Sequence, residues 1–134
     1  MWEPPPPQER STPVPPNQKT VQTALGSFRE EGPCWACWAE YEGRDLELHV
    51  DDAGGRPDQD QVTRLIGILA ELPAHDAECR RELACIDEHD LDGIFFDAGC
   101  DFQLAFSWGD GEWGRTVFVK IRSGKVIDAT IIID

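Results

Sequence analysis

The residues of this sequence best suited to chemistry are its cysteines and histidines. Cys34 and Cys37 form a C-x-x-C pair, a spacing found in redox-active thiols and in zinc sites. A redox pair works at the N-terminus of a helix, where the dipole lowers the thiol pKa, but the neighbouring Trp35, Trp38 and Tyr41 favour a strand. Residues three apart on a strand point to opposite faces. We therefore expect these two thiols to be structural.

Zinc binding would need two further ligands beside this pair. His75 precedes Cys79 by four residues, and Cys85 precedes His89 by the same spacing, so either pair could share one face of a helix. A single helix carrying both pairs would separate its two histidines by ~21 Å along the axis, too far for one ion. The metal-dependent alternative therefore combines one pair with the C-x-x-C. Its ligand set is Cys34, Cys37, His75 and Cys79.

Cysteine number and the start of the chain bear on the compartment. The chain has five cysteines, an odd number, and its first residues show neither the basic cluster nor the apolar stretch of a secretion signal. We therefore expect reduced thiols and a cytoplasmic protein. No apolar run reaches the ~18–20 residues that a membrane-spanning helix needs.

The negative charge is concentrated in the larger part of the chain. The net charge is −14 at pH 7, and residues 1–27 hold two acidic and two basic residues, so the whole excess falls in residues 28–134. Such a field repels phosphate backbones and anionic lipids, whereas it attracts basic proteins. We expect a basic protein as partner, and neither nucleic acid nor membrane.

Two acidic segments could contact such a partner. In residues 109–114 three glycines surround Trp113, which predicts a flexible acidic loop with a large aromatic side chain of the kind found in interface hot spots. Alternatively, Trp113 folds back over the end of the sheet. Residues 87–92 form a second acidic cluster. The expected partner-binding residues are Trp113, Asp110, Glu112, Asp87, Glu88, Asp90 and Asp92.

Motifs of known catalytic machinery are missing from the sequence. It has neither a G-x-S-x-G nucleophile elbow nor a phosphate-binding P-loop. No base is evident near Ser107 or Ser123, the two serines beyond residue 27. We therefore expect no enzymatic activity and no cofactor.

The elements that must position these residues follow from hydrophobic periodicity. Residues 34–41 and 46–50 predict two strands joined at Gly43. Residues 58–72 predict a helix that Asp58 caps and Pro73 stops. A second helix is predicted over residues 75–87. Short strands are then predicted around residues 94–96, 102–108, 117–121 and 126–133.

These elements predict one α+β domain over residues 28–134. Its antiparallel sheet consists of an N-terminal hairpin and a C-terminal meander, and the two helices cover it. Seven of the ten prolines lie in residues 1–27, where they block helix and sheet hydrogen bonds. That segment is predicted to be a disordered, proline-rich tail.

The segment 96–119, FDAGCDFQLAFSWGDGEWGRTVFV, resembles a family of small bacterial domains of unknown function. Members typically show a D-G-x-F turn, alternating aromatic and aliphatic strand residues, and a D-G-D-x-F-W-G-H-S loop. The match covers about the last third of the chain, and Arg115 stands where the family usually carries histidine. The family brings no established activity. The counterparts in this chain are Phe102, Leu104, Phe106, Asp110, Gly111, Trp113 and Gly114.

Charge and missing motifs together favour a non-catalytic, acidic protein-binding module. Its most concrete form is an immunity-type inhibitor of a basic bacterial toxin or nuclease, as a monomer or weak homodimer. One alternative is the metal- or thiol-dependent protein that uses Cys34 and Cys37 with a His/Cys pair. Another is a self-associating structural domain, because the apolar strand 126–133 would be an edge that needs cover.

Overall fold

The computed structural model of the chain describes residues 19–110 and 113–133. These residues form one eight-stranded sheet, two α-helices and a short 3-10 helix. The α+β class is confirmed, with the sheet as the dominant element. In chain order the elements are β1 (Thr20–Thr23), β2 (Gly26–Glu31), β3 (Cys34–Tyr41), β4 (Arg44–Asp51), α1 (Gln59–Ala70), α2 (Leu72–Glu82), η1 (Ala84–Ile86), β5 (Asp90–Phe95), β6 (Phe102–Asp110), β7 (Trp113–Arg122) and β8 (Lys125–Ile133).

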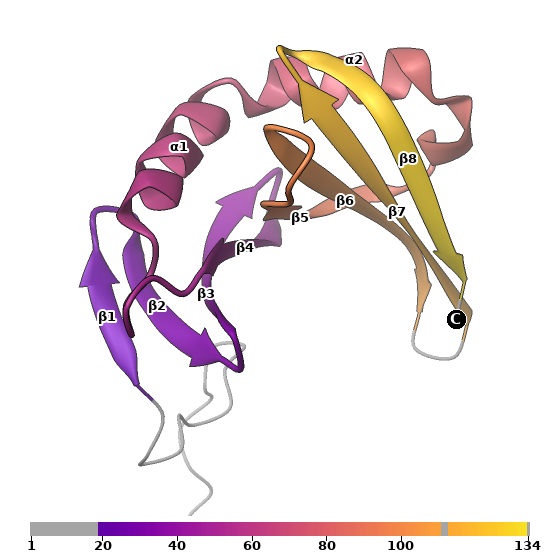
Figure 1. Cartoon of the computed structure of the whole chain (residues 1–134). Helices are drawn as coiled ribbons and strands as arrows, with labels where there is room; N and C mark the ends of the chain where they lie inside the picture. The colour runs from indigo at the N-terminus through magenta and orange to yellow at the C-terminus, as the bar shows by residue number, and fades with distance from the viewer. Residues whose placement is uncertain (1–18, 111–112, 134) are drawn as a thin grey trace, which may run out of the picture.

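The strands lie in the sheet in the order in which they occur in the chain. Neighbours are antiparallel except β4 and β5, which run parallel with Leu48 opposite Ile94. Parallel strands cannot be joined by a tight turn, so the chain crosses between them through α1, α2 and η1. The sheet is thus two four-stranded meanders, and Figure 1 shows them as the two arms of an arch with the helices along its outer side. The N-terminal part is larger than the predicted hairpin.

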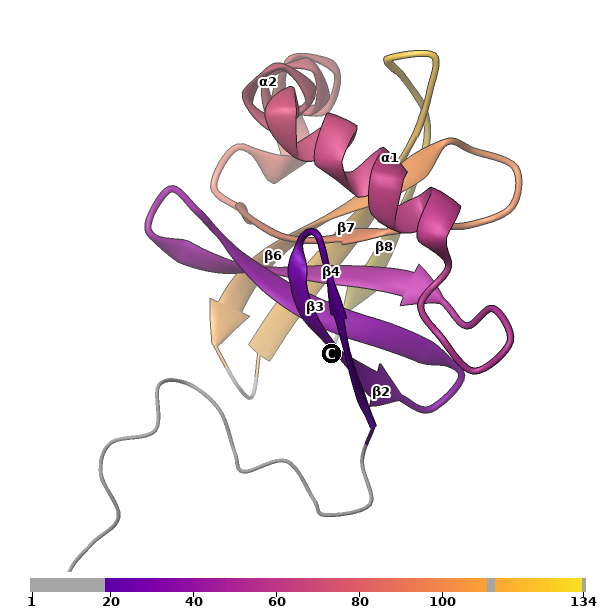
Figure 2. The same cartoon turned by 90° about the vertical axis from the view of Figure 1, so that its left-hand side faces the viewer.

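The core lies between the helices and one face of the sheet. On β4, Leu46, Leu48 and Val50 are at most 1% exposed, as the period-2 pattern predicted. α1 contributes three buried side chains at a spacing of three residues, which places them on one helix face. Figure 2 shows α1 running across the strands of the first arm. Among the largest fully buried side chains are Trp35, Phe28, Phe106, Leu65 and Leu104.

The boundaries of the two helices differ from those predicted. Asp58 caps α1 as expected, because its carboxylate accepts from the backbone N–H of Gln61 at 3.1 Å. Pro73 does not stop a helix but lies in the first turn of α2, where a missing N–H is tolerated. The predicted helix 75–87 therefore starts at Leu72 and ends at Glu82, before η1. Within the described residues, neither helix is long and apolar enough to cross a membrane.

The sheet begins earlier in the chain than predicted. β1 and β2 form a hairpin in which Val21 lies opposite Phe28, and Phe28 is fully buried. The predicted boundary at residue 28 therefore falls inside β2. Residues 17–32 contain no proline, so their backbone donors are available for sheet pairing. The predicted disorder of residues 1–18 lies outside the described part of the chain.

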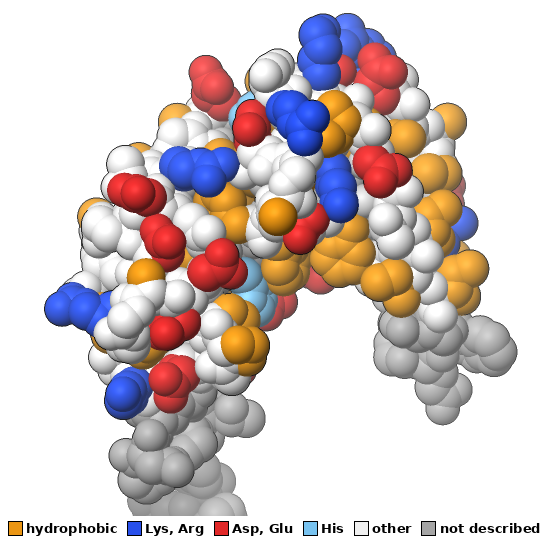
Figure 3. Space-filling view, in the orientation of Figure 1, with side chains coloured by type: hydrophobic (Ala, Val, Ile, Leu, Met, Phe, Trp, Pro, Cys, Tyr) orange, Lys and Arg blue, Asp and Glu red, His pale blue; other side chains and the backbone are white. Residues whose placement is uncertain are grey.

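β8 is an edge strand with an apolar surface. Ile127, Ile131 and Ile132 are about half exposed, and Ile133 is 74% exposed. Figure 3 shows hydrophobic side chains gathered on this arm, whereas acidic side chains are spread over the other arm. An uncovered edge offers unpaired backbone groups to another chain. Self-association through residues 126–133 stays a prediction.

Candidate functional site

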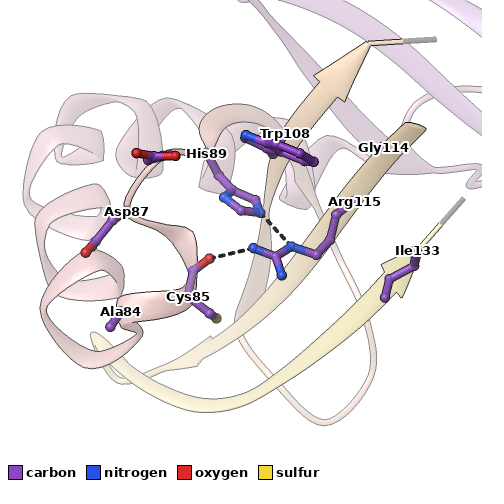
Figure 4. A pocket seen from close by; sticks show the side chains of 9 residues that line it. Ala84, Cys85, Asp87, His89, Trp108, Gly114, Arg115 and Ile133 are labelled. Carbon is purple, nitrogen blue, oxygen red and sulfur yellow. Dashed lines mark hydrogen bonds between the residues drawn. The ribbon is translucent and has the colours of Figure 1, made fainter. Parts of the chain in front are cut away.

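The candidate site is a hollow of about 690 Å³ where η1 and the chain that follows it meet the end of the β6–β7 hairpin. Figure 4 shows its walls: a loop with acidic side chains on one side, and strands β6 and β7 on the other. The last residue of β8 that the structure describes completes it. The lining residues are Ala84, Cys85, Asp87, Glu88, His89, Trp108, Gly114, Arg115 and Ile133.

Arg115 ties the floor of this pocket together. Its Nε donates to Nε2 of His89 at 3.0 Å, and a terminal nitrogen donates to the carbonyl oxygen of Cys85 at 3.1 Å (Figure 4). Since Nε2 of His89 accepts, the ring proton is on Nδ1. That buried Nδ1 has no hydrogen-bond partner among the described residues. The guanidinium therefore holds the β7 strand against the chain around η1.

His89 is a neutral structural group in this arrangement. It is 4% exposed. Burial lowers its pKa below the ordinary value, and the positive charges of Arg115 and Arg80 lower that pKa further. Only a neutral imidazole can accept a hydrogen bond from Arg115 at Nε2. The lowered pKa of His89 is therefore consistent with this hydrogen bond.

Trp108 forms the aromatic wall of the pocket. It lies opposite Arg115 in the β6–β7 ladder and is 50% exposed. Its ring is tilted by 30° against that of His89, with the centroids 6.5 Å apart. A half-exposed indole on a braced strand offers a large apolar face, with little side-chain entropy to lose on binding.

The acidic cluster 87–92 is divided by the fold. Asp87 and Glu88 are exposed at the pocket, and neither forms an ion pair with Lys or Arg in the described part of the chain. Asp90 opens β5 and pairs with Arg44 at 3.3 Å. Asp92 instead accepts from the hydroxyl of Ser107 at 3.2 Å. Only Asp87 and Glu88 are thus brought together with the aromatic wall.

A buried polar network supports the segment that carries these two carboxylates. Arg80 donates to Asp76 at 2.6 Å, and its terminal nitrogens donate to the carbonyl oxygens of Ile86, Asp87 and His89 at 2.8–3.2 Å. Tyr41 donates to the other oxygen of Asp76 at 3.0 Å. The network fixes the backbone of residues 86–89 and so orients the acidic rim of the pocket.

The prediction of a flexible loop over residues 109–114 is wrong for most of that segment. Gly109 pairs with Gly114, and Asp110 pairs with Trp113, so these residues extend β6 and β7. Alternating Phe102, Leu104, Phe106 and Trp108 already form one strand, and its ladder simply continues. Glu112, and the side chains of Asp110 and Trp113, lie outside the described part of the structure.

Trp108 was missed as a site residue. The alternation of β6 correctly placed it on the same face as the buried Phe106. Burial, however, ends before Trp108, because it lies near the end of the hairpin. The available signal was its position as the last aromatic residue before two glycines in an acidic stretch.

The ligands of the metal-dependent alternative do not meet. Cys34 and Cys37 point to opposite faces of β3, and Cys37 is buried in the core. Cys79 is fully buried, which raises its pKa to about 12. His75 packs edge-on against Phe102 with 5.0 Å between the centroids. Among the described residues, no three of His, Cys, Asp and Glu are placed to hold one metal ion.

Comparisons with protein-family models, with curated proteins and with solved structures give no significant match to this chain. The resemblance of residues 96–119 to a family of small bacterial domains therefore stays a prediction.

Proposed function

We propose that this chain is an acidic, non-catalytic protein-binding module that takes a basic side chain of its partner into the pocket at Trp108. The observation that carries the proposal is the half-exposed indole beside two exposed carboxylates, Asp87 and Glu88, that no cation neutralises within the described residues. The most specific form of this function is an immunity-type inhibitor that blocks a basic toxin or nuclease by occupying its surface.

The chemistry of the pocket suits a lysine or arginine side chain. A cation over the face of a tryptophan gains about 0.5–2 kcal/mol, and more as water is excluded. Asp87 and Glu88 would add charge-assisted hydrogen bonds at the rim. Arg115 is the cation among the lining residues, and two of its nitrogens already bond His89 and the carbonyl oxygen of Cys85.

The charge of the whole protein supports the same proposal. A net charge of −14 raises the rate at which a basic partner meets the acidic surface, and salt screens that effect. Fast, salt-sensitive association is characteristic of inhibitors that must capture a harmful enzyme as it appears. The rigid support of residues 86–89 by Arg80 lowers the entropy lost on binding.

The test begins with capture from the native source at low salt and release at high salt. The captured basic protein is identified, purified and rebound to three variants. Trp108→Ala should weaken binding by about 2 kcal/mol, roughly 30-fold in Kd, as for a hot spot. Asp87→Asn with Glu88→Gln should slow association and reduce its salt dependence.

The matched control is Asp60→Asn with Asp128→Asn, which also removes two negative charges, but from exposed positions on α1 and β8. Because long-range steering depends on total charge and the pocket depends on position, the control should lose only a small part of the association rate. The proposal fails if the control and the pocket variants lose the same affinity, or if no basic protein is captured.

A further inference from the structure

A second group of reactive side chains lies on the face of the sheet that the helices leave uncovered. There Cys34 on β3 lies beside Glu47 and His49 on β4, since Cys34 is opposite Asp51 and Ala36 is opposite His49 in the ladder. These three side chains share a face because they occupy alternate positions of adjacent antiparallel strands. The pocket at Trp108 uses none of them.

The three side chains lie in a row in which Cys34 could act as nucleophile, His49 as base and Glu47 as the acid that orients the base. Sγ of Cys34 lies 3.5 Å from Nδ1 of His49 and 3.3 Å from the backbone carbonyl oxygen of Glu31, so its proton can point to either acceptor. Nε2 of His49 lies 2.7 Å from a carboxylate oxygen of Glu47. A carboxylate only accepts, so the ring proton of neutral His49 is on Nε2 and Nδ1 is free to accept the thiol proton. Hydrogen-bond reach between thiol, base and a third orienting group is the signature of an assisted nucleophile.

Aromatic packing holds the imidazole of His49 in place. Its ring stacks on Phe95 with 4.6 Å between the centroids and an angle of 16° between the planes. Phe95 in turn meets Phe118 edge-on at 5.6 Å. The base is therefore oriented by Glu47 and by the ring beneath it, and it cannot swing away from the thiol without breaking both contacts.

A cavity of about 270 Å³ opens beside the thiol. Its walls are mainly hydrocarbon: Phe95, Phe96 and Val50 lie next to Cys34 and His49, and Asp51 is the one carboxylate of the lining. Such a cavity favours a small, uncharged molecule with an apolar skeleton over an ion. Cys34 itself is partly exposed at this surface, so it can be reached from solvent.

We propose that Cys34 is a nucleophilic thiol, assisted by His49 as general base, which adds to small α,β-unsaturated carbonyl compounds held against Phe95 and Phe96. The class is one of soft, uncharged electrophiles, which matches a sulfur nucleophile in an apolar cavity. This inference is independent of the proposed binding function, and it concerns the opposite face of the sheet.

The proton must move as the bond forms, because the surroundings do not favour a standing thiolate. Burial raises the pKa of Cys34, and the charges of Glu31, Asp51 and Glu47 raise that pKa further. Glu31 comes from β2 and pairs with Arg29 at 3.3 Å, and Asp51 of β4 accepts from the amide of Gln61. General-base assistance is the route by which a protonated thiol still attacks at neutral pH.

The reaction balances without any further reagent. The thiol proton passes to Nδ1 of His49 as the sulfur forms a bond to the β-carbon of the electrophile. The electrons of the carbon–carbon double bond move onto the carbonyl as an enolate, which takes the proton back at its α-carbon. The product is a thioether. No leaving group departs, and no oxidant or reductant is needed.

The test is labelling of the whole protein with N-ethylmaleimide, followed by mass spectrometry of each cysteine peptide over time. Cys34 should react faster than Cys100, which is also partly exposed. The sulfur of Cys100 likewise contacts a backbone carbonyl oxygen, that of Asp97, but it has no imidazole as a hydrogen-bond partner among the described residues. His49→Gln should slow Cys34 by roughly 100-fold or more, the lower end of general-base assistance. The matched control His75→Gln removes a histidine elsewhere and should leave the rate at Cys34 unchanged.

The pH profile separates assistance from simple exposure. In His49→Gln the rate at Cys34 should rise with pH as the thiol itself ionises, and it should rise more steeply than in the unmodified chain, where a base already takes the thiol proton at neutral pH. Circular dichroism of both histidine variants checks that the fold is retained. The inference is overturned if Cys34 reacts no faster than Cys100, or if His49→Gln changes neither the rate nor the profile.

Discussion

Replacing Arg80 by methionine should destabilise the protein far more than the same change one residue later at Arg81. The Arg80 side chain is 30% exposed and that of its partner Asp76 is 10% exposed, so the ion pair is largely buried. Removing one partner of a buried pair costs about 3–5 kcal/mol. Since Arg80 keeps some contact with water, we expect the lower limit, about 3 kcal/mol.

This magnitude also includes the bonds from Arg80 to three backbone carbonyls, which methionine cannot replace. The guanidinium carbon also lies 5.3 Å from the ring centroid of Phe106, so methionine loses this cation–π contact as well, while it keeps an apolar stem of similar length. Arg80→Lys keeps the charge but not the planar fork, and it should lose about half as much.

The matched control is Arg81→Met on the same helix. Arg81 is 68% exposed and, within the described part of the chain, pairs with Glu78 and Glu82 alone. Surface pairs of this kind contribute about 0–1 kcal/mol. Both changes remove one positive charge, so their effect on net charge is identical.

Urea unfolding followed by circular dichroism measures the difference. With an m-value of about 2 kcal/mol/M, Arg80→Met should lower the midpoint by about 1.5 M and Arg81→Met by less than about 0.5 M. A double-mutant cycle with Asp76→Asn should show that the two single losses do not add. The reasoning is refuted if Arg80→Met and Arg81→Met shift the midpoint equally.

Two further predictions concern packing and pH. Gly93→Ala should cost about 1–3 kcal/mol, because a Cβ there would lie 2.8 Å from the ring of Phe95 and 3.0 Å from a backbone oxygen. In α1, a Cβ at Gly67 would meet no described atom within 4 Å apart from the helix's own backbone. Gly67→Ala should therefore stabilise the protein by about 0.5–1 kcal/mol in the same urea assay. The lowered pKa of His89 means that, below about pH 6.5, the unfolded chain binds a proton that the folded chain does not. The free energy of unfolding should therefore fall as the pH drops below that value, and His89→Gln should reduce this fall. An unchanged slope in His89→Gln would contradict the prediction.

Local pattern was sufficient for most of the individual elements. The strands β3 and β4 and the capped start of α1 lie where alternation and the Asp58 signal placed them. The prediction from sequence failed at Pro73, which was expected to end a helix but lies in the first turn of α2. Proline is common both after the end of a helix and in its first turn, so the residue alone does not distinguish the two. The prediction also failed at β1 and β2, whose few apolar residues gain their stability from pairing with β3 and not from their own pattern.

The candidate site was predicted only in part. Asp87 and Glu88 were identified from charge, and both line the pocket. Trp108 was predicted only as the end of the strand 102–108, since alternation along β6 does not show where the helix cover ends. Asp90 and Asp92 were grouped with Asp87 and Glu88 because they are close in sequence, but strand β5 begins at Asp90, and its two carboxylates bond Arg44 and Ser107 instead of lining the pocket.

The sequence by itself determined the local conformation, the acidic charge and the opposite orientation of Cys34 and Cys37, because each depends on residues a few positions apart. Only the tertiary structure decided which distant side chains meet. The register of the β3–β4 hairpin brings His49 to Cys34, and the pairing of β5, β6 and β7 brings Arg115 to His89, over 15 and 26 residues of chain. Such encounters depend on strand order and on what the helices leave uncovered, and no pattern within one segment contains that information.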